Sequence, residues 1–140
     1  MDSGSSWVLD SWALMEWIQN REPATKAVDH LLQLAIREHA QLFISRINYG
    51  EVLYSCWRKF PEQAAARILA DVEALPIQIV EVTDNSVERA ARIKTVVSAS
   101  YADCFAAALA IVKNAPVVTG DPELRKIAQA FPLKLHWIGA

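Results

Sequence analysis

The sequence predicts an α/β fold, a three-layer sandwich in which helices flank a mainly parallel five-stranded sheet. Two observations lead to this fold class. Short apolar runs alternate with longer segments of helical periodicity along all 140 residues. Hydrophobic residues make up 53% of the chain and charged residues 21%, a balance that supports a buried core and excludes a disordered protein. Because no linker interrupts the alternation, we expect a single domain over residues 1–140, with residues 1–6 as a flexible, Ser-rich leader.

In the first half of the chain, each predicted element has its own local signal. Residues 7–9 form a short apolar run that stops at Asp10, and residues 41–44 form a similar run, so both are expected to be buried strands. Helices are predicted where apolar periodicity follows a capping residue or a proline. They are expected over residues 11–18, from Pro23 to Ala35, from a Ser45 cap through Trp57, and from Pro61 to Ala74.

In the second half, strands are expected over residues 77–80, 116–119 and 133–137. Helices are expected over residues 87–97, 102–113 and 122–130, with Thr83 or Asp84 capping the first of them. Residues 102–113 are almost wholly apolar, so this helix should be buried on most sides. Ligands of such α/β folds bind beyond the carboxyl ends of the strands, near the point where the strand order reverses.

Charge and cysteine content limit the class of protein. The net charge of −2 argues against a protein that coats nucleic acid by bulk charge. It does not exclude a local basic rim around an acidic site. The two cysteines lie in apolar helical stretches and do not suggest a disulfide framework, which favours a reducing compartment. The longest uncharged apolar run, residues 105–112, is far shorter than the ~20 residues of a spanning helix. We therefore expect a cytoplasmic protein without membrane association.

Four acidic residues occupy positions where a carboxylate is costly. Asp10 ends the first predicted strand, Asp121 follows the fourth, Glu51 lies on the helix after the second, and Asp103 lies in the first turn of the apolar helix. Each alone could be a helix cap, a partner of a helix dipole or a surface residue. Together they are harder to explain, because a carboxylate beside a packed core costs several kcal/mol unless it is paired or bound to a cation.

The sequence offers these acids no local countercharge. Neither Asp10 nor Asp103 has a Lys or Arg three or four residues away. Asn48 shares a helix face with Glu51, and Thr119 shares a strand side with Asp121, so both could hold a carboxylate in place. Carboxylate and neutral oxygen donors without a countercharge are what a hard divalent cation requires. The spacing therefore makes a metal site plausible.

Four segments of the chain resemble the motifs of the PIN-domain family, and most closely those of VapC-type toxins. They are VLDS at residues 8–11, ISRINYGE at 44–51, SYADCFAA at 100–107 and VTGDPE at 118–123. The resemblance implies a PIN sandwich, Mg²⁺ or Mn²⁺ dependence and endoribonuclease activity on RNA. It also implies the toxin role in a toxin–antitoxin pair, with a small cognate antitoxin as partner and a homodimer as the assembly.

All four catalytic acids of the family have a counterpart here, in Asp10, Glu51, Asp103 and Asp121, and the supporting polar positions match Ser11, Asn48 and Thr119. Cys104 departs from the small Ala usual at its position. The resemblance implies Asp10, Asp103 and Asp121 as metal ligands, and Glu51 as a ligand through water or a base that orients the nucleophile. Hydrolysis by a metal-activated water would leave a 5′-phosphate and a 3′-hydroxyl.

Further charged residues lie in or near the same motifs. Glu123 is the next acidic candidate, but an acid that favours the dipole of its own helix is the preferred interpretation. Arg46 and Arg125 are the preferred RNA-binding rim, ahead of Arg92, Lys94 and Lys126.

Two other classes of protein fit the sequence less well than the nuclease. The first is a non-catalytic PIN-like scaffold that acts through protein partners, which gives no physical reason for four converging carboxylates. The second is a phosphatase or receiver domain. A haloacid-dehalogenase phosphatase would need Asp-x-Asp after the first strand, where Ser11 and Trp12 follow Asp10. A receiver would need a Lys after the last strand, where residues 137–140 contain none.

Overall fold

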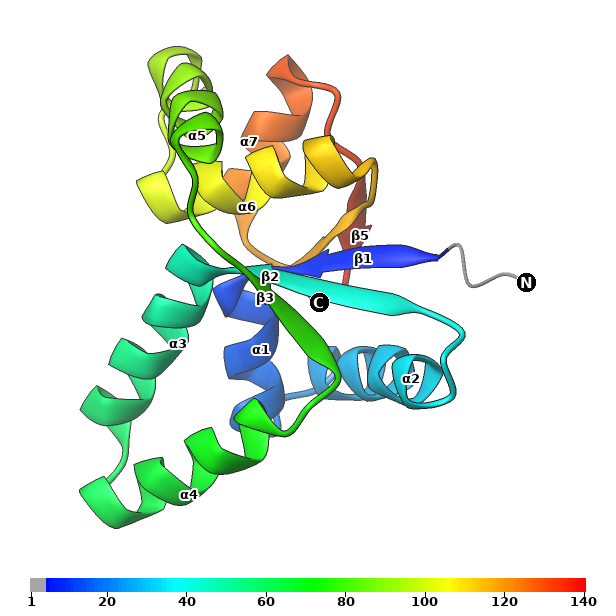
Figure 1. Ribbon diagram of the computed structural model, residues 1–140, viewed down its shortest axis with the longest axis vertical. Helices are drawn as coiled ribbons and strands as arrows, with labels where there is room; N and C mark the ends of the chain where they lie inside the picture. Colours follow the sequence, from blue (N-terminus) through cyan, green and yellow to red (C-terminus); the bar gives the residue numbers. More distant parts are fainter. Residues whose placement is uncertain (1–4) are drawn as a thin grey trace.

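The computed structural model describes residues 5–140, so residues 1–4 of the expected leader lie outside the described chain, and Ser6 already belongs to the first strand (Figure 1). Five strands form one sheet in the order β3-β2-β1-β4-β5, and every neighbouring pair is parallel. The strands are β1 (Ser6–Leu9), β2 (Gln41–Ser45), β3 (Ile77–Val80), β4 (Val117–Thr119) and β5 (Leu135–Trp137). The α/β fold predicted from the sequence is confirmed, with an all-parallel sheet.

Seven helices connect and cover the strands within the described residues. They are α1 (Ser11–Ile18), α2 (Ala24–Ile36), α3 (Arg46–Lys59), α4 (Glu62–Glu73), α5 (Asp84–Val96), α6 (Tyr101–Lys113) and α7 (Pro122–Ala130). Most begin where the sequence offers a cap: the side chains of Asp10, Ser45, Thr83, Ser100 and Asp121 each accept a backbone N–H of the helix that follows. Within residues 5–140, no single helix is long and apolar enough to cross a membrane. Helices α5 and α6 pass the same test only when taken together, as a pair bent by 117°.

The two faces of the sheet are covered by different helices, as Figure 1 shows. Side chains alternate between the faces with the period of two that strands impose. Val8, Phe43 and Val117 therefore pack against α5, α6 and α7, whereas Leu9 and Val118 face the opposite layer of α1 and α2. A third apolar cluster joins α1, α3 and α4 beneath β2. The carboxyl ends of the strands thus emerge between two rigid helical layers.

Chain order explains why one edge of the sheet collects polar side chains. From β1 the chain proceeds to β2 and β3 on one side, and it then crosses to β4 and β5 on the other. Strand order therefore reverses between β1 and β4, which is where α/β folds bind ligands. Residues just after these two strands lie at this reversal point.

Candidate metal centre

Asp10 and Asp121 follow the two strands that flank the reversal of strand order. Asp10 comes directly after β1, and Asp121 comes two residues after the end of β4. Each caps the helix that follows it: Asp10 accepts the N–H of Ala13 at 2.8 Å, and Asp121 accepts that of Glu123 at 2.9 Å. Each cap occupies only part of the acceptor capacity of its carboxylate, so both acids keep oxygen lone pairs for a further partner.

Thr119 connects these two acids. Its hydroxyl donates to the carboxylate of Asp10 and accepts the backbone N–H of Asp121 at 2.9 Å. Thr119 and Asp10 are almost fully buried, so both groups are held in one geometry by the surrounding core. The sequence-based expectation that Thr119 would hold a neighbouring carboxylate agrees with these contacts, although the acid it contacts directly is Asp10.

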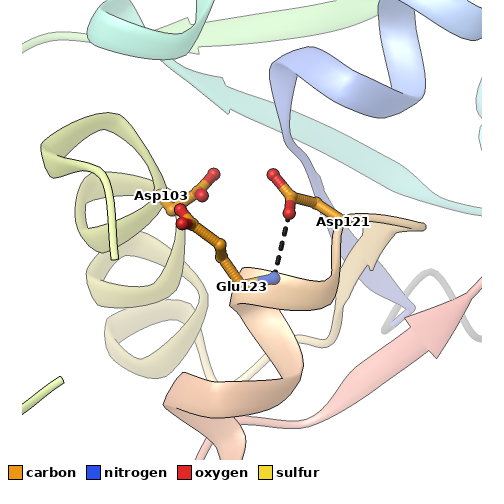
Figure 2. A group of neighbouring side chains, drawn as sticks. All are labelled: Asp103, Asp121 and Glu123. Atoms are coloured by element: carbon orange, nitrogen blue, oxygen red, sulfur yellow. Dashed lines mark hydrogen bonds between the residues drawn. The ribbon is translucent and has the colours of Figure 1, made fainter. Parts of the chain in front are cut away.

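Three carboxylates converge beside Asp10, one from α6, one from α7 and one from the residue that caps α7. One oxygen each from Asp103, Asp121 and Glu123 lies within 4.8 Å of the others. Figure 2 shows that Asp103 extends from α6, Glu123 from the first turn of α7, and Asp121 from the turn that leads into α7. A spacing of this kind allows a single cation to contact oxygens from separate elements.

Glu123 lies in the first turn of α7, as expected, and also belongs to the acidic group. The preferred interpretation made it a first-turn acid of its own helix, yet its carboxylate accepts the backbone N–H of Ser100 at 2.9 Å and lies in the acidic group. Its position two residues after Asp121, on the same helical turn, was the available signal. What the sequence could not provide was the distance between α6 and α7.

Glu51 approaches the site from α3 on the other layer. Its carboxylate accepts a hydrogen bond from the hydroxyl of Ser11 at 2.6 Å. It is not one of the three converging oxygens, but its negative charge reaches Asp10 and helps to raise the pKa of that residue. The bond between Ser11 and Glu51 therefore joins α1 to α3 beside Asp10.

Asn48 fixes the helix that carries Glu51. Its side-chain amide donates to the backbone carbonyl of Ala102 at 3.2 Å, and its own backbone N–H donates to the hydroxyl of Ser45 at 3.0 Å. Asn48 is fully buried, so these bonds join α3 to the first turn of α6, one residue before Asp103. It positions acids on both sides of the site.

The electrostatics of the site favour a cation. Burial raises the pKa of Asp103 to about 9, assisted by its hydrogen bond with Glu123 and by the charges of Asp121 and Asp10. Burial also raises the pKa of Asp10 to about 7, against the hydrogen bonds from Thr119 and Ala13 that favour its charged form. Both carboxylates are therefore costly to ionise in the protein alone.

The donor set fits a hard divalent metal ion. Its ligating atoms are carboxylate oxygens, and within residues 5–140 no Lys, Arg or His forms an ion pair with any acid of the group. A divalent cation would supply the positive charge that these acids lack. The structure thus agrees with the metal site that the sequence made plausible.

The two arginines preferred as an RNA-binding rim have other contacts. Arg46 forms an exposed ion pair with Glu81, and the guanidinium of Arg125 lies 3.5 Å from the ring centroid of Trp137. The pair with Glu81 competes directly with a phosphate for Arg46. The sequence could not foresee this partner, because it lies 35 residues away at the end of another strand.

Two lysines, Lys94 and Lys126, act electrostatically on Glu123. The ammonium of Lys94 donates to the backbone carbonyl of Ala99 at 2.7 Å, next to Ser100, whose N–H reaches Glu123. The pKa of Glu123 is lowered, first by its hydrogen bonds with Asp103 and Ser100 and then by the charges of Lys126 and Lys94. Lys94 at the end of α5 and Lys126 on α7 thus supply positive charge beside Glu123.

Gly120 allows the loop before Asp121 to pass under an aromatic ring. A Cβ at this position would overlap the indole of Trp12. We expect Gly120→Ala to lower the free energy of unfolding by about 1–3 kcal/mol, the usual cost of overpacking. Chemical denaturation measures this change.

Gly50 provides the matched control for that substitution. It lies inside α3, and a Cβ there would meet no atom within 4 Å. Gly50→Ala should therefore stabilise the protein by about 0.5–1 kcal/mol through helix propensity. Equal effects of the two substitutions would contradict the packing of Trp12 against the site loop.

Fold and site together define an α/β protein with a carboxylate cluster at the carboxyl edge of a parallel sheet. The chain belongs to the PIN domain family, whose model matches residues 7–130. This finding confirms the resemblance carried by the four sequence motifs. No curated protein sequence matches the chain significantly.

Solved structures with the same fold include several toxins. VapBC2 from Rickettsia felis, bound to a DNA fragment from its promoter, superposes with a TM-score of 0.72 at 17% identity, covering 94% of this chain and 97% of that one. A toxin–antitoxin complex from Klebsiella pneumoniae gives 0.64 at 17% identity, covering 91% and 98%. VapC20 of Mycobacterium tuberculosis, a toxin that cleaves the sarcin–ricin loop, gives 0.68 at 16% identity, covering 89% and 95%.

Proposed function

We propose that this protein is a divalent-metal-dependent endoribonuclease and the toxin of a toxin–antitoxin pair. The observation that carries the proposal is the convergence of Asp103, Asp121 and Glu123 beside the buried Asp10, with no ion pair from these acids to a basic side chain among the described residues. Membership of the PIN family and the likeness to toxin structures support the same function. A scaffold that only binds partners would carry the cost of these carboxylates without using them.

Each acid has a place in the proposed reaction. Asp10, Asp103 and Asp121 would hold Mg²⁺ or Mn²⁺, with Glu123 as a further oxygen donor. When bound, such a cation would neutralise charge on the phosphate and lower the pKa of a water molecule toward neutrality. Glu51, held by Ser11 across the site, would orient the attacking water or accept its proton.

The residues around the acids keep the site in one geometry. Thr119 holds Asp10 and the backbone of Asp121, and Asn48 holds α3 against α6. Lys94 and Lys126 would contact the RNA backbone beside the acids. Attack by water would leave a 5′-phosphate and a 3′-hydroxyl on the products.

The partners follow from the same proposal. We expect a small cognate antitoxin and a homodimer of this chain. The solved complexes from Rickettsia felis and Klebsiella pneumoniae support the first expectation, because each contains a PIN-like toxin together with its antitoxin.

Cleavage of RNA by purified, antitoxin-free protein tests the function. Wild-type protein should cleave RNA with Mg²⁺ or Mn²⁺, and EDTA should stop it. The Asp10→Asn variant keeps an oxygen for the N–H of Ala13 but removes a carboxylate from the metal, so it should be inactive. Equal cleavage by the variant would reveal a contaminating nuclease, and folded protein that binds neither metal nor RNA would overturn the proposal.

A further inference from the structure

A row of exposed side chains leads away from the acidic site along α3. Tyr54 and Arg58 follow Glu51 by three and seven residues, a spacing that places all three on one side of the helix. Arg58 lies about 10 Å further along the axis than Glu51. Figure 1 shows α3 starting beside α6 and running away from the sheet, so this row extends outward from the site.

Tyr54 and Arg58 form one preorganised unit. The guanidinium of Arg58 donates to the hydroxyl of Tyr54, and its central carbon lies 5.4 Å from the centroid of the tyrosine ring. Tyr54 is 55% exposed despite its size. The ring thus presents an aromatic surface to solvent at a position fixed by its neighbour on the helix.

Arg58 retains its charge for a ligand. Arg21, Arg46 and Arg92 each pair with a carboxylate, whereas Arg58 has no such partner in the described part of the chain. It is followed by Lys59, so the last turn of α3 is basic. An unpaired guanidinium beside an exposed aromatic ring matches the requirements of single-stranded nucleic acid, which stacks bases on rings and places phosphates on cations.

We propose that Tyr54 and Arg58 bind a nucleotide of single-stranded RNA that flanks the scissile phosphate, with its base on the Tyr54 ring and its phosphate on Arg58. This inference rests on the proposed ribonuclease function and identifies the direction in which the RNA leaves the acidic site. Because a base inside a duplex has both faces covered by its neighbours and cannot stack on a protein ring, the same contact favours unpaired RNA over a duplex.

Steady-state cleavage of a short single-stranded RNA in Mn²⁺ tests the inference. Tyr54→Ala and Arg58→Ala should each raise KM about fivefold or more with little change in kcat, the scale of one lost base stack. Tyr54→Phe keeps the ring and should retain most of the affinity. Arg37→Ala is the matched control, because Arg37 is an exposed arginine at the end of α2, near the edge of the sheet where β2 begins and away from the acids, and its substitution should leave KM unchanged.

The same variants are also measured without catalysis. Fluorescence anisotropy of the labelled RNA in EDTA reports binding alone, and a duplex of the same sequence should bind more weakly and respond little to Tyr54→Ala.

If wild-type protein cleaves RNA but Tyr54→Ala and Arg58→Ala keep its KM and affinity, this inference is wrong while the nuclease function stands. If those variants instead change only the elution volume in gel filtration, the row is a contact between copies of this chain, which also overturns it. Absence of cleavage by wild-type protein would count against the nuclease function, and the anisotropy series would still decide the binding site.

Discussion

Replacing Asp103 by asparagine is expected to abolish RNA cleavage and, at the same time, to stabilise the metal-free protein. Cleavage should fall by at least about 100-fold, because loss of even an outer partner of a metal ligand costs 10- to 100-fold. Burial, Glu123 and the other acids raise the pKa of Asp103 to about 9. Near neutral pH, folding therefore requires Asp103 to take up a proton that the unfolded chain does not bind, which lowers the free energy of unfolding. Asparagine removes this cost, so stability should rise. The asparagine amide can donate to Glu123 without a proton from solvent.

The two effects have separate measurements. Cleavage rates in Mn²⁺ report the first, and denaturation in EDTA near pH 7.5 reports the second, with an expected gain of about 1–3 kcal/mol. Asp84→Asn is the control, because Asp84 also lies in the first turn of a helix but is exposed and outside the site. A variant that loses both activity and stability would indicate that Asp103 supports the fold rather than the chemistry.

The sequence predicted the fold because local signals and the global topology agree. Residues 11–18, 77–80 and 122–130 were predicted with the bounds that the structure has. The small differences occur at element ends. The second helix begins at Ala24 because Pro23 occupies its N-cap, and β5 begins at Leu135, the residue that pairs with Val117. Strand order was not predicted, since it depends on contacts between distant segments.

The candidate site was predictable as far as chain position determines it. Asp10 and Asp121 follow strands, and parallel strands end at one edge, so their proximity follows from the fold class. The inclusion of Glu123 and the diversion of Arg46 to Glu81 depend on how α7 approaches α6 and how β3 ends beside α3. Those distances arise from packing between layers, which residue spacing does not encode.

Without metal, the protein should lose stability as the pH rises from about 5 to about 9. The pKa of Asp10 rises from 3.8 to about 7 in the folded state, and that of Asp103 from 3.8 to about 9. Between these values the folded protein binds more protons than the unfolded chain, so the free energy of unfolding falls with pH. The contribution of each carboxyl group to stability is therefore fully present below about pH 4. It is lost as the pH rises to the pKa of that group in the folded state, by at most about 1.4 kcal/mol per pH unit for each group.

A divalent cation should reverse this trend, because it binds the ionised carboxylates that the protein alone disfavours. Saturating Mg²⁺ or Mn²⁺ stabilises the folded state by about 2.7 kcal/mol at 100 times its dissociation constant. The rise in melting temperature on adding metal should accordingly be larger at pH 8.5 than at pH 5.5, where protons compete with the cation. Thermal unfolding in EDTA and in Mn²⁺ across this range measures both curves.

The Asp10→Asn variant separates the two titrations. It removes the group with a pKa of about 7, so the decline of the metal-free curve below neutral pH should become shallower, while the part due to Asp103 persists to about pH 9. A metal-free stability that is flat from pH 5 to pH 9, or a metal effect independent of pH, would mean that these acids are already compensated within the protein. The carboxylates would then have no electrostatic need for a cation, and the physical basis of the proposed metal centre would be lost.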